Sequence, residues 1–240
     1  MSTVILPARG GSKRIVRKNI RPFAGRPMLV RALDVARDCG LFDRIVVSTD
    51  DPEIAALARA QGAEVPFMRP PVLANDQAGT LPVVRHALQA LGTADTETVF
   101  CLYPCVPLLA PETLRQAQAT LLELHDPRFV FPVLRYGAPI QRALRRLPDG
   151  RLVPLHPEHA LTRTQDLEPA FHDAGQFYCA RAWTWRDAPA IHAWGHGLPI
   201  PPWQAVDIDT EADWIWAERL YLAQSTLRQT DPADLIALTQ

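Results

Sequence analysis

Hydrophobic residues in the first half of the chain alternate between short, mainly apolar runs and spaced patterns. The runs, which are typical of buried β-strands, occupy residues 3–6, 44–49, 64–67 and 98–102. Elsewhere apolar residues recur every three or four positions, as on one face of a helix. Helices are predicted on this basis at residues 27–39, 52–61, 80–91 and 111–124. Pro27 suits a first helical position, Thr80 can cap the third helix, and Gly40 and Gly62 end the first two.

The regular alternation of strand and helix predicts an α/β fold with a mostly parallel sheet and helices on both faces. In such sheets, ligands bind beyond the carboxyl ends of the strands. Three segments fall at that edge: PARGGSKR (residues 7–14), STDD (residues 48–51) and YPCVPL (residues 103–108). The chemistry of the protein is therefore expected in these segments.

The pattern changes after about Arg135. Residues 135–173 are rich in Pro, Arg and His and show little periodicity, which indicates an insertion rather than a second full domain. Strand character returns at residues 175–179, and a last helix is predicted at residues 210–222. We expect one domain, residues 1–224, that contains the insertion, followed by a C-terminal tail, residues 225–240, with no informative pattern.

Composition narrows the class of protein. With 240 residues, of which 48% are hydrophobic, the chain can bury a sizeable core. A net charge of -1 argues against general nucleic-acid binding, which needs a basic excess. Neither a membrane helix of roughly 20 apolar residues nor a signal peptide is recognisable. We expect a cytoplasmic protein with no membrane or nucleic-acid partner, and its four cysteines, which lack metal-ligand spacing, as core thiols.

The strongest chemical signal is the Gly-rich loop, residues 7–19, which combines paired glycines with cations. Gly10 and Gly11 allow backbone N–H groups to approach phosphate oxygens, and Lys13 and Lys18 can offset a triphosphate's charge. The loop has neither the Walker A spacing nor the G-x-G-x-x-G spacing. A solvated basic turn is the alternative, but the position directly after the first strand of an α/β sheet favours phosphate binding.

Asp207 and Asp209, before the last predicted helix, form a second signal. Residues two apart in an extended segment point to the same side, so both carboxylates can converge on one Mg²⁺ ion. This ion prefers oxygen ligands and often completes its shell with substrate phosphates. Alternatively, Asp209 or Thr210 caps the helix. Asp50 and Asp51 present the same choice, between a ligand site and a cap for the helix that follows.

Four collinear segments together resemble the cytidylyltransferases that make CMP-activated acidic sugars. They are PARGGSKR with Lys18 and Asn19, FDRIVVSTDD (residues 42–51), GAEVPFMRP (residues 62–70) and DIDTEADW (residues 207–214). The resemblance covers nearly the whole chain, to about Tyr221. Residues 157–178, PEHALTRTQDLEPAFHDAGQFY, most resemble the pseudaminic acid branch of that family. The resemblance implies a Rossmann-like nucleotide-diphospho-sugar transferase fold with an inserted segment for dimerisation and sugar binding.

The resemblance also implies roles for individual residues. Those matching the CTP site are Ala8, Arg9, Gly10, Gly11, Ser12, Lys13, Lys18, Asn19, Arg69 and Thr80. Among them, Arg9, Lys13 and Lys18 would stabilise charge on the leaving pyrophosphate. Asp207 and Asp209 would bind Mg²⁺, and Asp209 counts with the three cations as catalytic. Tyr103 stands where sialate enzymes carry Gln, which indicates a differently substituted nonulosonic sugar.

Candidates for the sugar site come from the insertion and the strand after it. With Tyr103 they are Gln141, Arg163, Asp166, His172 and Gln176. Arg163 stands out because Arg grips a carboxylate with two parallel hydrogen bonds. A structural role is the alternative for each of them. In relatives this region also contributes to a dimer interface, so a homodimer is expected.

The expected reaction transfers CMP from CTP to the anomeric hydroxyl of a nine-carbon acidic sugar and releases pyrophosphate. The sequence offers no strong general base, so metal-assisted deprotonation is expected. Pseudaminic acid is the expected sugar, and legionaminic and N-acetylneuraminic acids are alternatives. A catalytically inactive, nucleotide-binding dimeric protein is the alternative from another class, against which Lys13 and the two aspartates argue.

Overall fold

One mixed β-sheet forms the centre of the molecule. The computed structural model describes residues 1–126 and 128–229. Within these residues, seven strands pair in the order β11-β6-β10-β5-β1-β4, with β9 paired to β6. They are β1 (Ser2–Pro7), β4 (Arg44–Ser48), β5 (Thr98–Leu102), β6 (Phe129–Arg135), β9 (Phe171–Asp173), β10 (Phe177–Arg181) and β11 (Gly195–Pro199). Strands β4, β1 and β5 are parallel, as are β6 and β11, whereas β10 and β9 are antiparallel to their neighbours. The predicted, mostly parallel sheet is confirmed.

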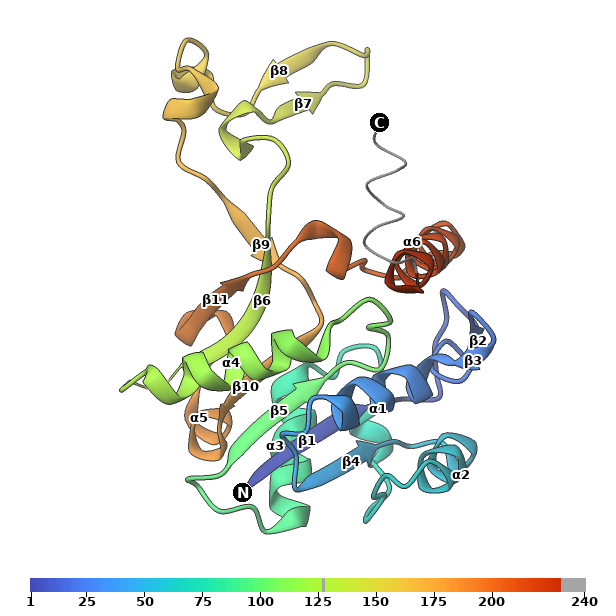
Figure 1. Cartoon of the computed structure of the whole chain (residues 1–240). Helices are drawn as coiled ribbons and strands as arrows, with labels where there is room; N and C mark the ends of the chain where they lie inside the picture. The colour runs from blue at the N-terminus through green and yellow to red at the C-terminus, as the bar shows by residue number, and fades with distance from the viewer. Residues whose placement is uncertain (127, 230–240) are drawn as a thin grey trace.

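Helices cover both faces of this sheet (Figure 1). One face carries α1 (Met28–Asp38), α2 (Pro52–Ala60) and α4 (Pro111–Glu123), packed around residues such as Leu29 and Phe100. The other carries α3 (Thr80–Leu91) and α5 (Ala182–Asp187), packed around Phe129 and Trp185. The indole Nε1 of Trp185 donates to the Val99 carbonyl oxygen at 3.1 Å, so this large ring is buried with its polar atom paired.

The last helix, α6 (Glu211–Gln229), packs against the segment that follows β1. That segment contains a short hairpin, β2 (Pro22–Phe23) and β3 (Arg26–Pro27). Phe23 lies edge-on to Trp214 and Tyr221, with ring centroids 5.4 and 5.7 Å apart. The Arg31 guanidinium lies 4.3 Å from the Tyr221 ring centroid and donates from Nε to the Phe23 carbonyl at 2.8 Å. This packing brings the start of α6 to the Gly-rich loop.

Residues 136–170, which we call the arm, project away from the sheet (Figure 1). They contain the antiparallel pair β7 (Leu144–Arg146) and β8 (Leu152–Pro154) and the 3₁₀ turns η2 (Ile140–Arg142), η3 (Pro157–His159) and η4 (Thr164–Asp166). The exposed large apolar side chains on the arm are those of Tyr136, Ile140, Leu144, Leu152, Leu155 and Leu161. The arm thus presents an apolar surface that this chain leaves in contact with solvent.

Several local predictions were wrong. Residues 64–67 form no strand: Glu64 makes an isolated bridge with Val46, and Met68, just after the segment, makes another with Thr49. Gly79, not Thr80, is the residue that precedes α3, and the Thr80 hydroxyl contacts Tyr103 instead of capping the helix. Pro27 likewise precedes α1 rather than beginning it.

The last helix extends further than the predicted residues 210–222. Helix α6 continues to Gln229, so the first residues of the predicted tail are helical, and residues 230–240 of that tail lie outside the described residues. Cys39, Cys101 and Cys179 are buried and free, as predicted for core thiols, while Cys105 is half-buried. In the described part of the chain, none of the helices combines the length and apolarity that crossing a bilayer requires.

Candidate active site

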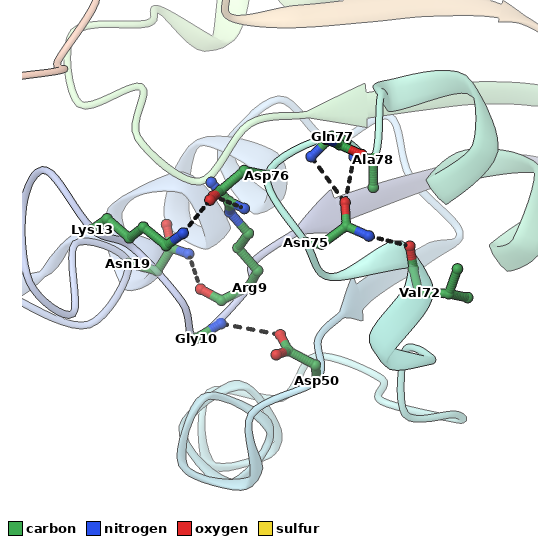
Figure 2. A network of polar contacts seen from close by, with 10 residues as sticks. All are labelled: Arg9, Gly10, Lys13, Asn19, Asp50, Val72, Asn75, Asp76, Gln77 and Ala78. Carbon is green, nitrogen blue, oxygen red and sulfur yellow. Dashed lines mark hydrogen bonds and ion pairs between the residues drawn. The ribbon is translucent and has the colours of Figure 1, made fainter.

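The Gly-rich loop leaves β1 at the carboxyl edge of the sheet and is tied to the end of β4. The Ala8 N–H donates to the Ser48 carbonyl at 2.9 Å, which extends the pairing of the two strands. The Gly10 N–H donates to Asp50 Oδ1 at 3.0 Å (Figure 2). A Cβ on Gly10 would lie 2.5 Å from Asp51 Oδ2, so a side chain here would push the two segments apart. Glycine is required because the loop packs directly on the aspartates.

Asp51 caps α2, which is one of the two roles predicted for it. Its Oδ1 accepts from the backbone N–H groups of Glu53 and Ile54 at 2.8 and 3.1 Å, and its Oδ2 accepts from Arg17 Nη1 at 2.6 Å. Burial alone would raise the pKa of Asp51, but these hydrogen bonds and the Arg17 charge bring its pKa below the ordinary value. Asp51 therefore anchors the loop and the helix together as a carboxylate.

Asn19 and Cys105 support the Gly-rich loop from beneath. Asn19 is buried, and its Nδ2 donates to the Arg9 carbonyl at 2.8 Å. The Cys105 thiol donates to Asn19 Oδ1 at 3.5 Å, and burial raises the pKa of this thiol to about 12, so it keeps its proton. The Ser12 N–H donates to the Gly10 carbonyl at 3.0 Å, whereas a Cβ on Gly11 would meet open space. Asn19, predicted near the nucleotide, thus holds the loop in shape.

Two of the predicted catalytic cations converge on one carboxylate. Arg9 Nη1 and Lys13 Nζ lie 2.7 and 2.5 Å from the two oxygens of Asp76 (Figure 2). Asp76 sits in a turn held by Asn75, whose Oδ1 accepts from the N–H groups of the two residues after Asp76 at 2.8 and 2.9 Å. Asp76 therefore occupies a position that an anionic group of a ligand would otherwise take between the two cations.

We expect Asp76→Asn to lower the KM for the triphosphate that the Gly-rich loop is predicted to bind, by about two- to fivefold at low salt. Removing the carboxylate frees Arg9 and Lys13 from an exposed ion pair. The free energy of such a pair corresponds to a change in KM of about that size. Steady-state kinetics over a salt series provides the measurement, and the gain should shrink as salt rises. The control is Asp126→Asn, which removes a similarly exposed carboxylate paired with Arg128. A higher KM for that triphosphate in Asp76→Asn would instead make this carboxylate a support for the cations.

The second half of the Gly-rich loop reaches the predicted metal-binding aspartates. Arg14 Nη1 lies 2.6 Å from Asp209 Oδ2, and Lys18 Nζ lies 4.0 Å from Asp209 Oδ1. Lys18 also donates to the Ile208 carbonyl. It is thus Arg14 and Lys18 that contact the aspartate segment, while the ion pair of Lys13 is with Asp76. The start of the chain and the segment before α6 nevertheless meet at one edge of the sheet.

Thr210, not Asp209, caps α6. The Thr210 hydroxyl accepts from the Asp213 N–H at 3.3 Å, and the Asp213 carboxylate accepts from the N–H groups of Thr210 and Asp209 at 2.7 and 3.1 Å. The carboxylates of Asp207 and Asp209 are thereby left for other partners. Burial raises the pKa of Asp207, and the nearby Asp209 carboxylate raises it further against the charges of Lys18 and Arg14. Two mutually repelling carboxylates at one place are what a divalent cation would stabilise.

A cavity of about 230 Å³ lies beside the Gly-rich loop. Its lining residues are Pro7, Arg9, Arg69, Leu73, Asn75, Asp76, Ala78, Gly79, Thr80, Val83 and Tyr103. The structure thus brings together four residues predicted from separate segments: Arg9, Arg69, Thr80 and Tyr103. Arg69 is buried, and its Nε donates to the Ser48 hydroxyl at 3.1 Å. The hydroxyl oxygens of Thr80 and Tyr103 lie 2.6 Å apart. We call this space the loop cavity.

The remaining sugar-site candidates are dispersed. On the arm, Gln141 Nε2 donates to the Glu168 carbonyl at 3.0 Å, and Arg163 Nε donates to Asp166 Oδ2 at 3.0 Å. His172 lines a different cavity, of about 420 Å³, beside β6, β9 and β11. Gln176 is buried below Tyr103, whose N–H donates to the Gln176 carbonyl at 2.9 Å.

The side chain of Gln176 holds an unused acceptor. Its Nε2 donates to the Gln204 carbonyl at 2.6 Å, whereas its buried Oε1 has no hydrogen-bond partner among the described residues. A buried amide oxygen without a partner is costly, which suits an atom that awaits a donor from a ligand.

Sequence reasoning did not single out Asp76, and it named Arg14 only as a member of the Gly-rich loop. Asp76 follows an Asn in a turn-forming stretch, and Arg14 sits within the Gly-rich loop, so both carried a local signal. Sequence reasoning also passed over Asp173 and His192, which are distant in the sequence although Asp173 Oδ2 lies 2.7 Å from His192 Nε2.

The chain is similar in sequence to known proteins. A family model described as "Cytidylyltransferase" matches residues 3–182. The pseudaminic acid cytidylyltransferase of Campylobacter jejuni serotype O:2 is 37% identical over 220 residues, which cover 90% of this chain and 94% of that protein. The CMP-N,N'-diacetyllegionaminic acid synthase of Legionella pneumophila is 30% identical over 230 residues, with the same two coverages.

A solved structure supports the fold. CMP:2-keto-3-deoxy-manno-octonic acid synthetase, in complex with CTP, matches with a TM-score of 0.68 over 93% of this chain and 99% of that one. The sequence identity is 16%, so this match concerns the fold alone.

Proposed function

This chain belongs to the cytidylyltransferase family, and we propose that it transfers CMP from CTP to pseudaminic acid. The observation that carries the choice of sugar is the 37% identity to a pseudaminic acid cytidylyltransferase along almost the full length of both chains. The legionaminic acid enzyme is less similar, at 30% identity over the same share of the chain.

The reaction asks for positioning and charge neutralisation rather than covalent catalysis. The anomeric oxygen of the sugar bonds to the α-phosphorus of CTP, the bond from that phosphorus to the β-phosphate oxygen breaks, and the hydroxyl gives its proton to solvent water. Negative charge grows on the departing pyrophosphate. Arg9, Lys13 and Lys18 stand around the Gly-rich loop and supply the positive charges that stabilise it.

Asp207 and Asp209 suit a Mg²⁺ ion shared with the substrate. The Asp209 carboxylate is near enough to raise the pKa of Asp207, and among the described residues no cluster of three or more His, Cys, Asp or Glu side chains forms a complete protein cage for a metal. Mg²⁺ is often bound in this way, by one or two carboxylates together with phosphates and water. When bound, it would polarise a phosphate oxygen and acidify the attacking hydroxyl. Arg14 and Lys18 lie beside Asp209 and hold its carboxylate in position.

The sugar would enter beside the loop cavity. Tyr103 presents its hydroxyl there, and the unpaired Gln176 Oε1 lies in the layer below. Arg163 and Gln141, which lie on the arm, remain sugar-site candidates that would need the arm of a second subunit to reach this place, and His172 remains a candidate at the separate cavity beside β9. The exposed apolar residues of the arm, such as Leu144 and Leu161, supply a reason for two subunits to pair. Sedimentation at assay concentration tests the homodimer, and an active monomer would contradict it.

We place the enzyme in the cytoplasm, where its nucleotide substrate is made. All four cysteines are free, which suits a reducing compartment.

A pyrophosphate-release screen tests the proposal directly. Purified enzyme with CTP and Mg²⁺ is given pseudaminic, legionaminic, N-acetylneuraminic and 3-deoxy-octulosonic acids in turn. We expect pseudaminic acid to give the highest kcat/KM, by about tenfold or more, because mismatched polar groups are rejected strongly in such sites. A higher kcat/KM for another acid would change the sugar. If the protein binds CTP but releases no pyrophosphate with any of the four acids, an inactive nucleotide-binding protein would be favoured.

A further inference from the structure

Residues 200–210, which we call the connecting segment, join β11 to α6 and carry Asp207 and Asp209 (Figure 1). Apart from the 3₁₀ turn η6 (Pro202–Gln204), the segment contains no helix or strand. Its path is therefore set by contacts with neighbouring elements rather than by its own backbone hydrogen bonds. Whatever holds this segment also determines where the two carboxylates lie.

Gln204 is the residue at which buried polar groups hold the connecting segment. Its carbonyl accepts from Gln176 Nε2 at 2.6 Å, and its side-chain Oε1 accepts from the Thr113 hydroxyl at 3.1 Å. Gln176 directly precedes β10, Thr113 lies in the first turn of α4, and both residues are buried. Hydrogen bonds in such surroundings are stronger than those that water can replace. The sheet and α4 thus fix a residue three positions before Asp207.

Apolar packing continues this support on both sides of Asp207. Ala205 is buried in a small cluster with Ala174, which lies two residues before Gln176. Ile208 is buried in the cluster between the start of α6 and the segment after β1, and its carbonyl accepts from Lys18. The backbone that carries the two carboxylates is thereby held from the sheet on one side and from the Gly-rich loop on the other.

Gln176 connects the connecting segment to the loop cavity. The Tyr103 N–H donates to the Gln176 carbonyl at 2.9 Å, and Tyr103 lines that cavity. Gln176 therefore contacts the cavity wall through its main chain and the connecting segment through its side chain. Its Oε1 is buried without a hydrogen-bond partner among the described residues. An apolar side chain would avoid this cost, so the presence of an amide here indicates that the Nε2 donor is needed.

We propose that Gln176 is a positioning residue that fixes Asp207 and Asp209 relative to the loop cavity, so that a divalent cation and the triphosphate can be bound together. The inference rests on the proposed function, because it takes the two aspartates as ligands of that cation. Gln176 itself touches neither the ion nor the nucleotide. It acts through Gln204, by ordering the connecting segment before the ion binds and so lowering the entropy cost of binding.

Gln176→Leu is the sharpest test, because leucine is apolar and of similar size and removes the Nε2 donor together with the unpartnered Oε1. We expect the Kd for Mn²⁺, measured by electron paramagnetic resonance on the CTP complex without sugar, to rise about five- to tenfold. The calorimetric Kd for CTP without metal should stay within about twofold of wild type. Hydrogen exchange in the peptide covering residues 203–210 should become about fivefold faster or more, as measured by mass spectrometry.

Gln224→Leu serves as the matched control. Gln224 Nε2 donates to the Trp203 carbonyl at 2.7 Å, so this variant removes the same kind of donor from the neighbouring carbonyl of the same segment. That bond is exposed, and water can replace it. The Mn²⁺ Kd of Gln224→Leu should therefore stay within about twofold of wild type.

Thr113→Val tests the same role from the other side of Gln204. It removes the second buried hydrogen bond at this residue with little change of shape, and should also raise the Mn²⁺ Kd. Melting temperatures show which variants are folded, and if Gln176→Leu is not, Thr113→Val decides the question.

Two results would overturn the inference: an unchanged Mn²⁺ Kd in the folded variants, or an equal rise in Gln224→Leu. A change in Gln176→Leu confined to the KM of the sugar would also overturn it, because it would indicate direct contact between Gln176 and the sugar. Mn²⁺ binding and hydrogen exchange need no turnover. A wild type that releases no pyrophosphate with any acidic sugar therefore contradicts the proposed function alone.

Discussion

Asp209→Asn is expected to lower kcat by a factor of about 100 or more while leaving the melting temperature nearly unchanged. The substitution keeps the size of the side chain but removes a charge that faces Asp207, Arg14 and Lys18. Thr210 and Asp213 cap α6 without the Asp209 side chain, so the helix should survive. A missing group of this kind costs about 100- to 1000-fold where charge develops in the transition state. Pyrophosphate release at saturating CTP and sugar provides the measurement.

The Mg²⁺ dependence of this variant distinguishes a metal ligand from a tether. If Asp209 holds the ion, the Mg²⁺ concentration for half-maximal rate should rise in Asp209→Asn. If it only steadies Arg14 and Lys18, the rate should fall with an unchanged Mg²⁺ curve. Glu211→Gln is the matched control, since it removes an exposed carboxylate paired with Arg21 two residues along. Pyrophosphate release by Asp209→Asn near the wild-type rate would refute any catalytic role.

The sequence predicted the parallel half of the fold well because that half is built from local patterns. Strands β1, β4 and β5 and helices α1 to α4 each carry the expected run or period. Strand β11 was not predicted because its sequence, GHGLP, has almost no hydrophobic pattern. Its glycines are needed by packing: a Cβ on Gly195 would lie 2.8 Å from the Phe131 ring. Strand β6 contains Pro132, which argues against a strand when only the sequence is considered.

The candidate site was predictable where one segment carried several of its residues. The Gly-rich loop and Asp207 with Asp209 were located from spacing, and the fold places them at one edge of the sheet. Which cation meets which carboxylate was not predictable, since Lys13 and Arg14 point to Asp76 and Asp209 from adjacent positions. Such a choice depends on the local path of the backbone, which the pattern of residues does not reveal.

Lys13→Ala is expected to reduce kcat by a factor of about 100 or more, because it removes a cation that the proposed reaction sets beside the departing pyrophosphate. The chain has only two lysines, Lys13 and Lys18, against 23 arginines, and both lie in the Gly-rich loop. A compact ammonium is suited to a phosphate oxygen as a point charge. Lys13→Arg should therefore recover part of the rate. Arg128→Ala, which removes an exposed cation elsewhere, should have little effect.

The two lysines also permit a test without substitution. An amine-specific reagent should modify Lys13 first, since its side chain is 79% exposed against 22% for Lys18. Saturating CTP should protect Lys13 because the triphosphate replaces Asp76 as its partner. Mass spectrometry of the two lysine-containing peptides measures the protection, and loss of activity should follow the modification of Lys13. Full activity after complete modification of Lys13, or an unchanged rate in Lys13→Ala, would make this part of the loop structural.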